Sequence, residues 1–365
     1  NGTKKSLKNI LKTEKRSSLL FGKLATMKKK ILLTGVSGTV GKEVLSQLIK
    51  LDYYEVSVLT RRNSLKQKKI KTILNKVAVI NCDLSRPEDI LKINEKFDIV
   101  IHLAAIIPPL ADEKPKLAEV VNTNGTINLI KQLEKVSPNA FFMYSSSISV
   151  YGDRIVSPNI KVSDPLSISF GDEYAKTKIN AEKAIINSNL SWTIFRLTAI
   201  MGIKNHKMSG LMFHMPLDTS IEICTPSDTA RAFVNGINKV EQLKGGVYNL
   251  GGGEHCRTSY KEFLEKNFEL NGLGKPNFPL KTFAEKNFHC GFYADGDELE
   301  EITNFRKDTL DNYYQMNKES IPLIQKIVAS IFKGIIKYFM QRQSEPLKAF
   351  KEKDQQLMNR FFKTN

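Results

Sequence analysis

Cysteine and histidine, the residues of disulfide frameworks and metal centres, are scarce in this 365-residue sequence. It has four cysteines, none in a C-x-x-C pair, and five scattered histidines. This pattern fits a reducing compartment and offers no readable zinc site, so we expect a cytoplasmic protein without a metal. No stretch of about 18 apolar residues is free of charge, which argues against a transmembrane helix. The first residues lack the apolar core of a secretory signal.

Acidic residues are scarce at both ends of the chain. The net charge is +17, from 55 basic and 38 acidic residues. Residues 1–30 carry +9 and residues 316–365 carry +6, which leaves 31–315 nearly neutral at +2. A basic tail is more often a solvated or surface-seeking appendage than a reader of base sequence. We therefore expect no nucleic-acid partner.

Apolar runs alternate with helical patterns from residue 29 onward. The runs are rich in Val, Ile and aromatic residues and apolar on both faces, as in strands covered by helices on both sides. This alternation predicts an α/β fold with a Rossmann-type, doubly wound parallel sheet. The six expected strands are 31–34, 56–59, 77–80, 99–104, 140–145 and 192–197.

The chain is longer than the roughly 250–300 residues at which single cores stop growing, so we expect a second, smaller lobe. The predicted division is a basic extension at 1–26, a Rossmann-type domain at 27–200, a small α+β lobe at 201–315, and a basic helical tail at 316–365. Some elements of the lobe are expected to return to the main sheet.

A glycine-rich turn follows the first strand and opens a helix. Glycine there lets the backbone turn tightly, approach a pyrophosphate and pack helix on strand, and the helix N-terminus favours phosphate. The alternative is a tight strand–helix turn without a ligand. The residues expected to hold a dinucleotide here are Gly35, Ser37, Gly38, Thr39, Val40 and Gly41.

The second strand ends at Arg61 and Arg62, about twenty residues past the last glycine of the turn. An acid at this place would bind the ribose diol of NAD, whereas an arginine can pair with the 2′-phosphate of NADP. We therefore expect NADP to be preferred to NAD. The alternative is two solvated surface arginines.

Tyr174 and Lys178 are four residues apart, which places them on one helix face. A nearby ammonium favours the phenolate, so this pair predicts a tyrosine that exchanges a proton, although the same spacing is common on structural helices. Serines 145–147 close the fifth strand, at the sheet edge where open α/β folds bind ligands. A serine hydroxyl there can stabilise an oxygen that gains charge.

These motifs together resemble the extended short-chain dehydrogenase/reductase family, also called the NAD-dependent epimerase/dehydratase family. The matching segments are TGVSGTVG (34–41), CDL (82–84), HLAA (102–105), NTNGT (122–126), SSISVYG (146–152), YAKTK (174–178) and FRLTAIMG (195–202).

The resemblance implies Tyr174 as general acid/base, Lys178 as its pKa tuner and a ribose ligand, and Ser147 as the donor to the substrate oxygen. It also implies that Asp83 holds the adenine and that Asn122 supports the site. The further cofactor contacts that it implies are Leu84, Leu103, Ala104, Ala105 and Leu197.

We therefore expect an NAD(P)-dependent oxidoreductase that transfers hydride at a carbinol or carbonyl carbon of a small molecule, and that forms a homo-oligomer. A nucleotide-sugar epimerase with tightly bound NAD is the nearest alternative, and a non-enzymatic dinucleotide sensor or scaffold is a second. Ile148-Ser149 stands where the dehydratase branch has Thr-Asp-Glu, so sugar dehydration is not expected.

The tail contains the stretch IPLIQKIVASIFKGIIKYFM at 321–340, which predicts one amphipathic helix. Lys326, Lys333 and Lys337 share a narrow face, and apolar residues cover most of the rest. Such a helix can lie peripherally on a membrane, dock on a subunit or the core, or stay disordered. The sequence leaves these alternatives open.

Overall fold

The main body is a seven-stranded parallel sheet in the order β10-β7-β5-β4-β1-β2-β3. The computed structural model describes residues 28–61, 75–203 and 209–363, so the extension at 1–26 and Arg62 lie outside the described residues. The strands are β1 (Lys29–Thr34), β2 (Tyr54–Thr60), β3 (Ala78–Asn81), β4 (Ile99–His102), β5 (Phe141–Ser147), β7 (Ser191–Leu197) and β10 (Gly246–Leu250).

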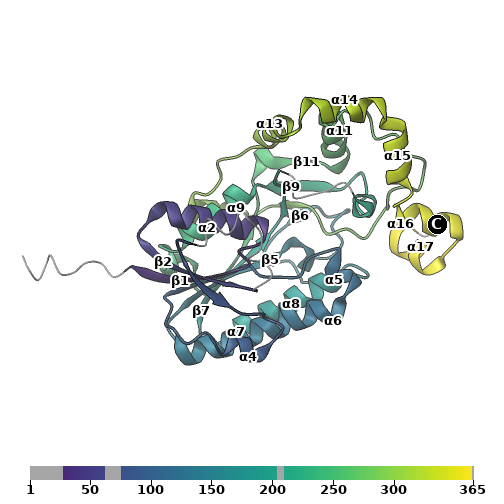
Figure 1. The fold of residues 1–365 in the computed structure, drawn as a ribbon. Coiled ribbons are helices and arrows are strands. Elements are labelled where there is room, and N and C mark those ends of the chain that lie inside the picture. The colour runs from purple at the N-terminus through teal and green to yellow at the C-terminus, as the bar shows by residue number, and fades with distance from the viewer. Residues whose placement is uncertain (1–27, 62–74, 204–208, 364–365) are drawn as a thin grey trace, which may run out of the picture.

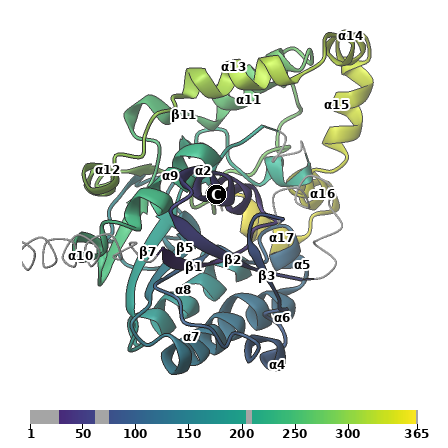
Figure 2. The same ribbon diagram turned by 60° about the vertical axis from the view of Figure 1, so that its left-hand side comes forward.

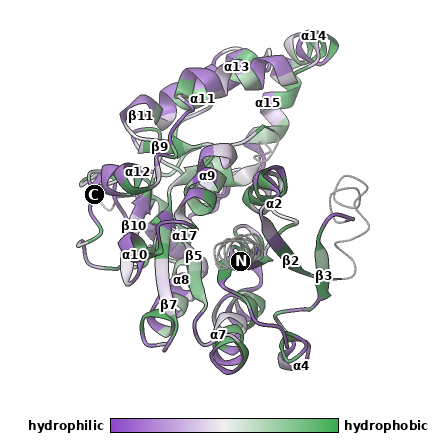
Figure 3. Cartoon of the chain, turned by 90° about the vertical axis from the view of Figure 1, so that its left-hand side faces the viewer, coloured by the Kyte–Doolittle hydropathy of each residue, from purple (hydrophilic) through white to green (hydrophobic). Residues whose placement is uncertain are grey.

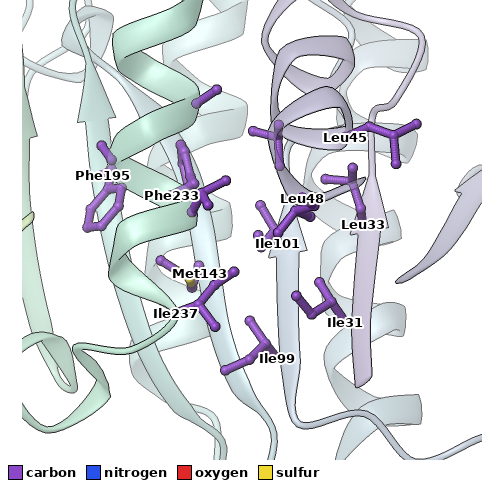
Figure 4. Close-up of a cluster of buried hydrophobic side chains, with 14 of the residues drawn as sticks. Ile31, Leu33, Leu45, Leu48, Ile99, Ile101, Met143, Phe195, Phe233 and Ile237 are labelled. Carbon is purple, nitrogen blue, oxygen red and sulfur yellow. The ribbon is translucent and has the colours of Figure 1, made fainter. Parts of the chain in front are cut away.

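Helices cover both faces of this sheet (Figure 1). One face carries α2 (Thr39–Leu51), α9 (Pro226–Gly236) and α12 (Asp297–Thr303). The other carries α4 (Pro87–Ile90), α7 (Gly125–Val136) and α8 (Glu173–Ile186). Because side chains alternate along a strand, the sheet supplies residues to two separate cores. Figure 4 shows the core under α2 and α9, where Ile31 and Leu33 of β1 lie by Leu45 and Leu48 of α2, and Phe233 of α9 lies beside Phe195.

The predicted Rossmann-type architecture is confirmed, with all six expected strands in one sheet. The strand order reverses between β1 and β4, which is the switch point where such sheets bind ligands. The seventh strand, β10, lies in the range expected for the lobe and pairs with β7. The chain therefore returns to the sheet after starting the lobe.

A smaller lobe stands beyond the carboxyl ends of the strands. Its sheet has the order β11-β9-β8, from Arg257–Ser259, Ser220–Cys224 and Ala199–Ile200. Helix α11 (Tyr260–Leu270) begins with a capping box in which Ser259 and Glu262 satisfy each other's backbone N–H groups. A second small sheet pairs β12 (Phe292–Tyr293) with β6 (Asn159–Ile160).

The tail forms helices that follow the outside of the lobe and then return toward α5 (Figures 1 and 2). They are α13 (Leu310–Ser320), α14 (Leu323–Ile331), α15 (Lys333–Gln341), α16 (Glu345–Glu352) and α17 (Gln355–Phe361). The expectation of one helix over 321–340 is wrong, because the stretch breaks at Phe332. Gly334 follows in the first turn of α15, and glycine weakens a helix at such a point.

The remaining elements of the described residues are short. They are α5 (Leu110–Glu113), α6 (Pro115–Ala118), the π-helical turn η2 (Glu119–Asn124), η3 (Ile148–Val150), η4 (Gly210–Phe213), α10 (Val240–Leu243) and η5 (Glu254–Cys256).

Candidate active site

The glycine turn between β1 and α2 has the geometry that the sequence predicts. Gly35 has φ +76°, a conformation that residues with side chains rarely adopt, and a Cβ on it would lie 2.7 Å from the Ala104 nitrogen. A Cβ on Gly41 would lie 2.2 Å from the Gly35 carbonyl oxygen. Two of the three glycines therefore allow backbone segments to approach closely.

The N-terminus of α2 faces this turn without a side-chain cap on its first N–H groups, as far as the described residues go. Gly38 holds the N-cap position, and the first turn of α2 has no acidic residue. Unpaired N–H groups and the positive end of the helix dipole together attract phosphate. The turn therefore fits the pyrophosphate of a dinucleotide.

A cavity of about 170 Å³ lies at the turn, over the strand ends of β1, β2 and β4. Nine of the predicted cofactor residues line it: Gly35, Ser37, Gly38, Arg61, Asp83, Leu84, Leu103, Ala104 and Ala105. Six lining residues were missed by the sequence analysis: Val36, Leu59, Thr60, Cys82, Ile106 and Val121. All of these except Leu59 adjoin a predicted residue along the chain, so widening the motifs by one position would have found them.

The other predicted cofactor residues surround this cavity or lie deeper along the sheet edge. Thr39, Val40 and Gly41 form the start of α2. Leu197 ends β7 and is paired in register with Ser147 of β5. Arg62 lies outside the described residues.

Asn122 connects the loop after β4 to the helix α8. Its side-chain oxygen accepts a hydrogen bond from the Ile106 nitrogen at 2.7 Å, and its amide donates to the Ile106 oxygen at 2.9 Å and to Thr177 Oγ1 at 3.0 Å. The residue stands in the π-helical turn η2, a distortion frequent at functional sites. Asn122 therefore supports the cavity wall from behind.

Asp83 has a structural contact as well as a place in the cavity. Its Oδ1 accepts hydrogen bonds from the nitrogen and the hydroxyl of Ser85, at 3.0 and 2.7 Å. These bonds shape the turn that leads to α4. The adenine contact implied for Asp83 stays a prediction.

Tyr174, Lys178 and Ser147 meet at the carboxyl end of β5. Ser147 lies near enough to the Tyr174 phenol to lower its pKa, and its hydroxyl accepts hydrogen bonds from the Ser149 nitrogen and hydroxyl at 3.2 and 3.0 Å. The Lys178 ammonium lies 5.7 Å from the centre of the Tyr174 ring and donates to the Ser145 carbonyl at 2.7 Å. Asp172 caps α8 by accepting from the Ala175 nitrogen at 2.8 Å, which fixes the helix start beside Tyr174.

The electrostatics of this trio differ from the expectation that Lys178 acidifies Tyr174. Burial raises the pKa of Tyr174, Asp172 raises it further, and only Ser147 lowers it. Burial also lowers the pKa of Lys178 to about 7. Burial therefore favours the protonated phenol, and the Lys178 ammonium donates to a carbonyl rather than to the phenol.

Glu182 is a further residue of this region, and the sequence analysis missed it. It lies four residues after Lys178 on α8, is buried, and accepts two hydrogen bonds from Arg196 and one from Ser146. It also raises the pKa of Lys178, against the larger effect of burial. The spacing Tyr174–Lys178–Glu182 would have identified it.

A cluster of charged residues lies at the start of α8. Asp172 is 3.4 Å from His289, and the side chain of Arg360 in α17 lies against Gly171. His214 contacts Glu345 of α16 at 2.9 Å. The tail helices therefore reach the side of the sheet edge on which Tyr174 stands.

Asp112 lies in the same cluster and has a buried Oδ1 with no hydrogen-bond partner among the described residues. Burial, with help from Asp172, raises its pKa to about 6, while Arg360 and the two histidines act in the opposite direction.

A glycine turn at the switch point of a parallel sheet, beside a tyrosine and a lysine one helical turn apart, defines a dinucleotide-binding α/β protein of the dehydrogenase class. Residues 31–251 match the model of the NAD dependent epimerase/dehydratase family. The chain belongs to this family, as its motifs predicted.

Curated relatives match at low identity. UDP-arabinose 4-epimerase 1 of Arabidopsis thaliana is 25% identical over 289 residues, covering 67% of each chain. Methionine adenosyltransferase 2 subunit beta of Rattus norvegicus is 25% identical over 176 residues, 48% of each chain. A 3-beta-hydroxysteroid dehydrogenase of Mycolicibacterium neoaurum is 28% identical over 168 residues, 44% of this chain and 43% of that one. The chain thus spans about half the length of several of these relatives.

Solved structures share the fold. UDP-glucuronic acid 4-epimerase from Bacillus cereus, in complex with UDP-glucuronic acid and NAD, has a TM-score of 0.64 at 19% identity, covering 80% of this chain and 98% of that one. UDP-glucose 4-epimerase from Thermus thermophilus, in complex with NAD, has a TM-score of 0.61 at 18% identity, with the same coverage.

Proposed function

We propose that the protein is an NAD(P)-dependent oxidoreductase of the extended short-chain type, acting at a carbinol or carbonyl carbon of a small molecule. The observation that carries this proposal is the meeting of Tyr174, Ser147 and Lys178 at the sheet edge that also bears the dinucleotide-shaped turn. A bound nicotinamide dinucleotide supplies or accepts the hydride. The residues of the chain bind it, place the substrate oxygen and move the proton.

The protonated state of Tyr174 suits the direction of carbonyl reduction. Its phenol donates a proton to the oxygen that gains charge, and the Ser147 hydroxyl stabilises the same oxygen. Lys178 donates to the Ser145 carbonyl, its ammonium lies 5.7 Å from the centre of the Tyr174 ring, and it would also hold a cofactor ribose. Oxidation in the reverse direction requires a lower pKa of Tyr174, which a nearby cationic nicotinamide favours.

The finer proposal for the cofactor is a preference for NADP. Arg61 lines the cavity at the end of β2, is exposed, and stands where an acid would bind the ribose diol of NAD. A guanidinium there can pair bidentately with a 2′-phosphate.

Substitution of Tyr174 by phenylalanine tests the catalytic proposal. We expect Tyr174→Phe to lose at least 10²-fold in turnover of NADPH with a panel of small aldehydes and ketones, since general acid catalysis contributes about 10²–10⁴-fold. Binding of NADP⁺, measured by calorimetry, should change less than threefold. The matched control is Tyr53→Phe, which removes a hydroxyl from a half-exposed tyrosine in the turn before β2.

Equal turnover by Tyr174→Phe and the unaltered protein would overturn the proposal. It would instead favour a dinucleotide-binding subunit without chemistry, a role consistent with the relative named as a subunit of methionine adenosyltransferase. Mass spectrometry of the purified protein tests the remaining alternative, a nucleotide-sugar epimerase with tightly bound NAD. A chain that retains NAD and gives no net oxidation or reduction would be an epimerase, as the UDP-arabinose 4-epimerase relative suggests.

A further inference from the structure

Helices α14 and α15 expose a large apolar surface at the edge of the lobe. No residue of α14 is buried, and Leu323, Ile324 and Ile331 are 73%, 71% and 70% exposed. The α14–α15 surface is defined by its exposed apolar residues: Leu323, Ile324, Ile327, Val328, Ile331, Phe332, Ile335, Tyr338 and Phe339. Soluble chains rarely leave so many large apolar side chains together in water.

The spacing of these residues gathers them into stripes. In α14, Leu323, Ile327 and Ile331 are four residues apart, and in α15 Ile335 and Phe339 repeat that spacing. Figure 1 places both helices on the outside of the lobe. Figure 3 shows apolar residues in green on both helices, with polar residues between them.

Only a narrow side of the two helices packs against the protein. Ala329, Ile336 and the buried Met340 contact the lobe core, and Lys337 donates to the Lys275 carbonyl at 3.1 Å. An open groove of about 400 Å³ runs beside this contact. Its lining includes Asn271, Leu273, Ile324, Val328, Ala329 and Ile336.

The charge of this region is of one sign. Residues 320–344 contain Lys326, Lys333, Lys337 and Arg342 and no Asp or Glu. A symmetric interface between two copies would bring this basic segment against itself, and like charges brought together cost free energy. Anionic lipid headgroups supply the missing negative charge, and a bilayer boundary also takes up the apolar side chains.

We propose that the α14–α15 surface binds an anionic lipid bilayer, with both helices lying in the headgroup region. Exposed apolar residues enter the acyl boundary while Lys326 and Lys333, both exposed, reach the headgroups. Tyr338 has the amphipathic ring that favours this depth. In the described part of the chain no helix is long and apolar enough to cross a membrane.

Vesicle sedimentation with the full chain tests this proposal. We expect the protein to sediment with vesicles of phosphatidylcholine and about 30% phosphatidylserine, to bind at least tenfold less to phosphatidylcholine alone, and to bind more weakly as salt rises. Ile324→Ser/Ile331→Ser and Lys326→Glu/Lys333→Glu should each lower binding at least tenfold. All four positions are exposed, so the melting temperature should stay within a few degrees.

Matched controls separate this surface from general stickiness. Leu280→Ser/Val156→Ser removes two apolar residues that are 91% and 90% exposed elsewhere, and Lys50→Glu/Lys96→Glu makes the same change of net charge. Both should bind like the unaltered protein. Tyr174→Phe should also bind normally, so this proposal stands or falls independently of the enzymatic one.

Three results would overturn the proposal. One is absence of binding to the anionic vesicles, and another is an equal loss in the control variants. The third is a dimer in analytical ultracentrifugation that Ile324→Ser/Ile331→Ser dissociates without any change in vesicle binding, because the surface would then be an interface between copies.

Discussion

Arg196 and Glu182 form a buried, two-pronged ion pair between β7 and α8. The Arg196 Nε and Nη2 atoms lie 3.1 and 2.8 Å from the two carboxylate oxygens of Glu182, and both side chains are almost fully buried. A third nitrogen of Arg196 donates to the Tyr151 hydroxyl at 2.8 Å. Because α8 also carries Tyr174 and Lys178, this pair holds the candidate catalytic helix at a set distance from the sheet.

Removing one partner of the pair should destabilise the protein strongly. Glu182→Gln leaves Arg196 buried with no opposite charge, and we expect a loss of about 3–5 kcal/mol in the free energy of unfolding. Glu241→Gln, at an exposed pair with Lys244, should cost less than about 1 kcal/mol. Urea unfolding measures both. A loss under about 1 kcal/mol for Glu182→Gln would show that water replaces the carboxylate.

The same pair should affect chemistry through Lys178. The double substitution Arg196→Met/Glu182→Leu fills the space of the ion pair with apolar side chains. It should recover part of the stability that Glu182→Gln loses. It also removes the carboxylate that favours the charged form of Lys178, so the pKa of that lysine falls further. We expect kcat to fall at neutral pH while the KM for cofactor changes less. If the pH profile of kcat is unaltered, the pair of Arg196 and Glu182 has only a structural role.

Substitution of glycine by alanine should have opposite effects on stability at Gly41 and at Gly334. A Cβ on Gly41 would meet the Gly35 carbonyl at 2.2 Å, so Gly41→Ala must displace the turn and should cost about 1–3 kcal/mol with loss of dinucleotide binding. No atom lies within 4 Å of a Cβ on Gly334, among the described residues. Gly334→Ala should stabilise the protein by up to about 1 kcal/mol. Thermal unfolding and NADPH fluorescence test both, and a tolerated Gly41→Ala would contradict the geometry.

We expect Arg61 to determine the preference for NADPH over NADH. A charge-assisted pair with a 2′-phosphate is worth about 1.5–3 kcal/mol, so Arg61→Ala should weaken NADPH binding about 10- to 100-fold and leave NADH binding within threefold. Arg86→Ala, at an exposed arginine just before α4, is the matched control. If both cofactors lose affinity equally, Arg61 does not distinguish them.

The strands and the glycine turn could be predicted because their signals are local. Each strand is a short apolar run, and Gly35 is required by a backbone conformation within its own turn. The place of β10 in the sheet could not be predicted from local signals, because its partner β7 lies some fifty residues earlier in the chain. The break at Phe332 was missed because hydrophobic periodicity continues through it while Gly334 weakens the backbone.

The electrostatic state of the site was equally out of reach of the sequence. Spacing places Tyr174 near Lys178, but the direction of each pKa depends on burial and on which group the ammonium meets, here the Ser145 carbonyl. Spacing places Glu182 on the same face of α8 as Lys178, but its pairing with the buried Arg196 depends on the fold. Local spacing therefore indicates which residues meet, and the surrounding residues decide how they titrate.

The raised pKa of Asp112 makes the free energy of unfolding depend on pH. Its pKa is about 6 in the folded protein and 3.8 in the unfolded reference, so between these two values the folded state binds more protons. The contribution of this group to stability is therefore present at low pH and is lost as the pH rises through the folded pKa. A fully buried group with this shift would contribute roughly 3 kcal/mol, and screening at the half-buried Asp112 reduces it to about 1 kcal/mol.

Asp112→Asn removes this titration, because an amide keeps the volume of the side chain without the charge. We expect the variant to be more stable than the unaltered protein by about 1 kcal/mol at about pH 7.5 and to lose that advantage by about pH 4. Glu113→Gln, at the exposed neighbour, should leave the pH dependence as it is. Urea unfolding at a series of pH values across this window gives the two curves. Parallel curves for Asp112→Asn and the unaltered protein would mean that Arg360 and the two histidines of the cluster neutralise the carboxylate, and that Asp112 is ionised in the folded state.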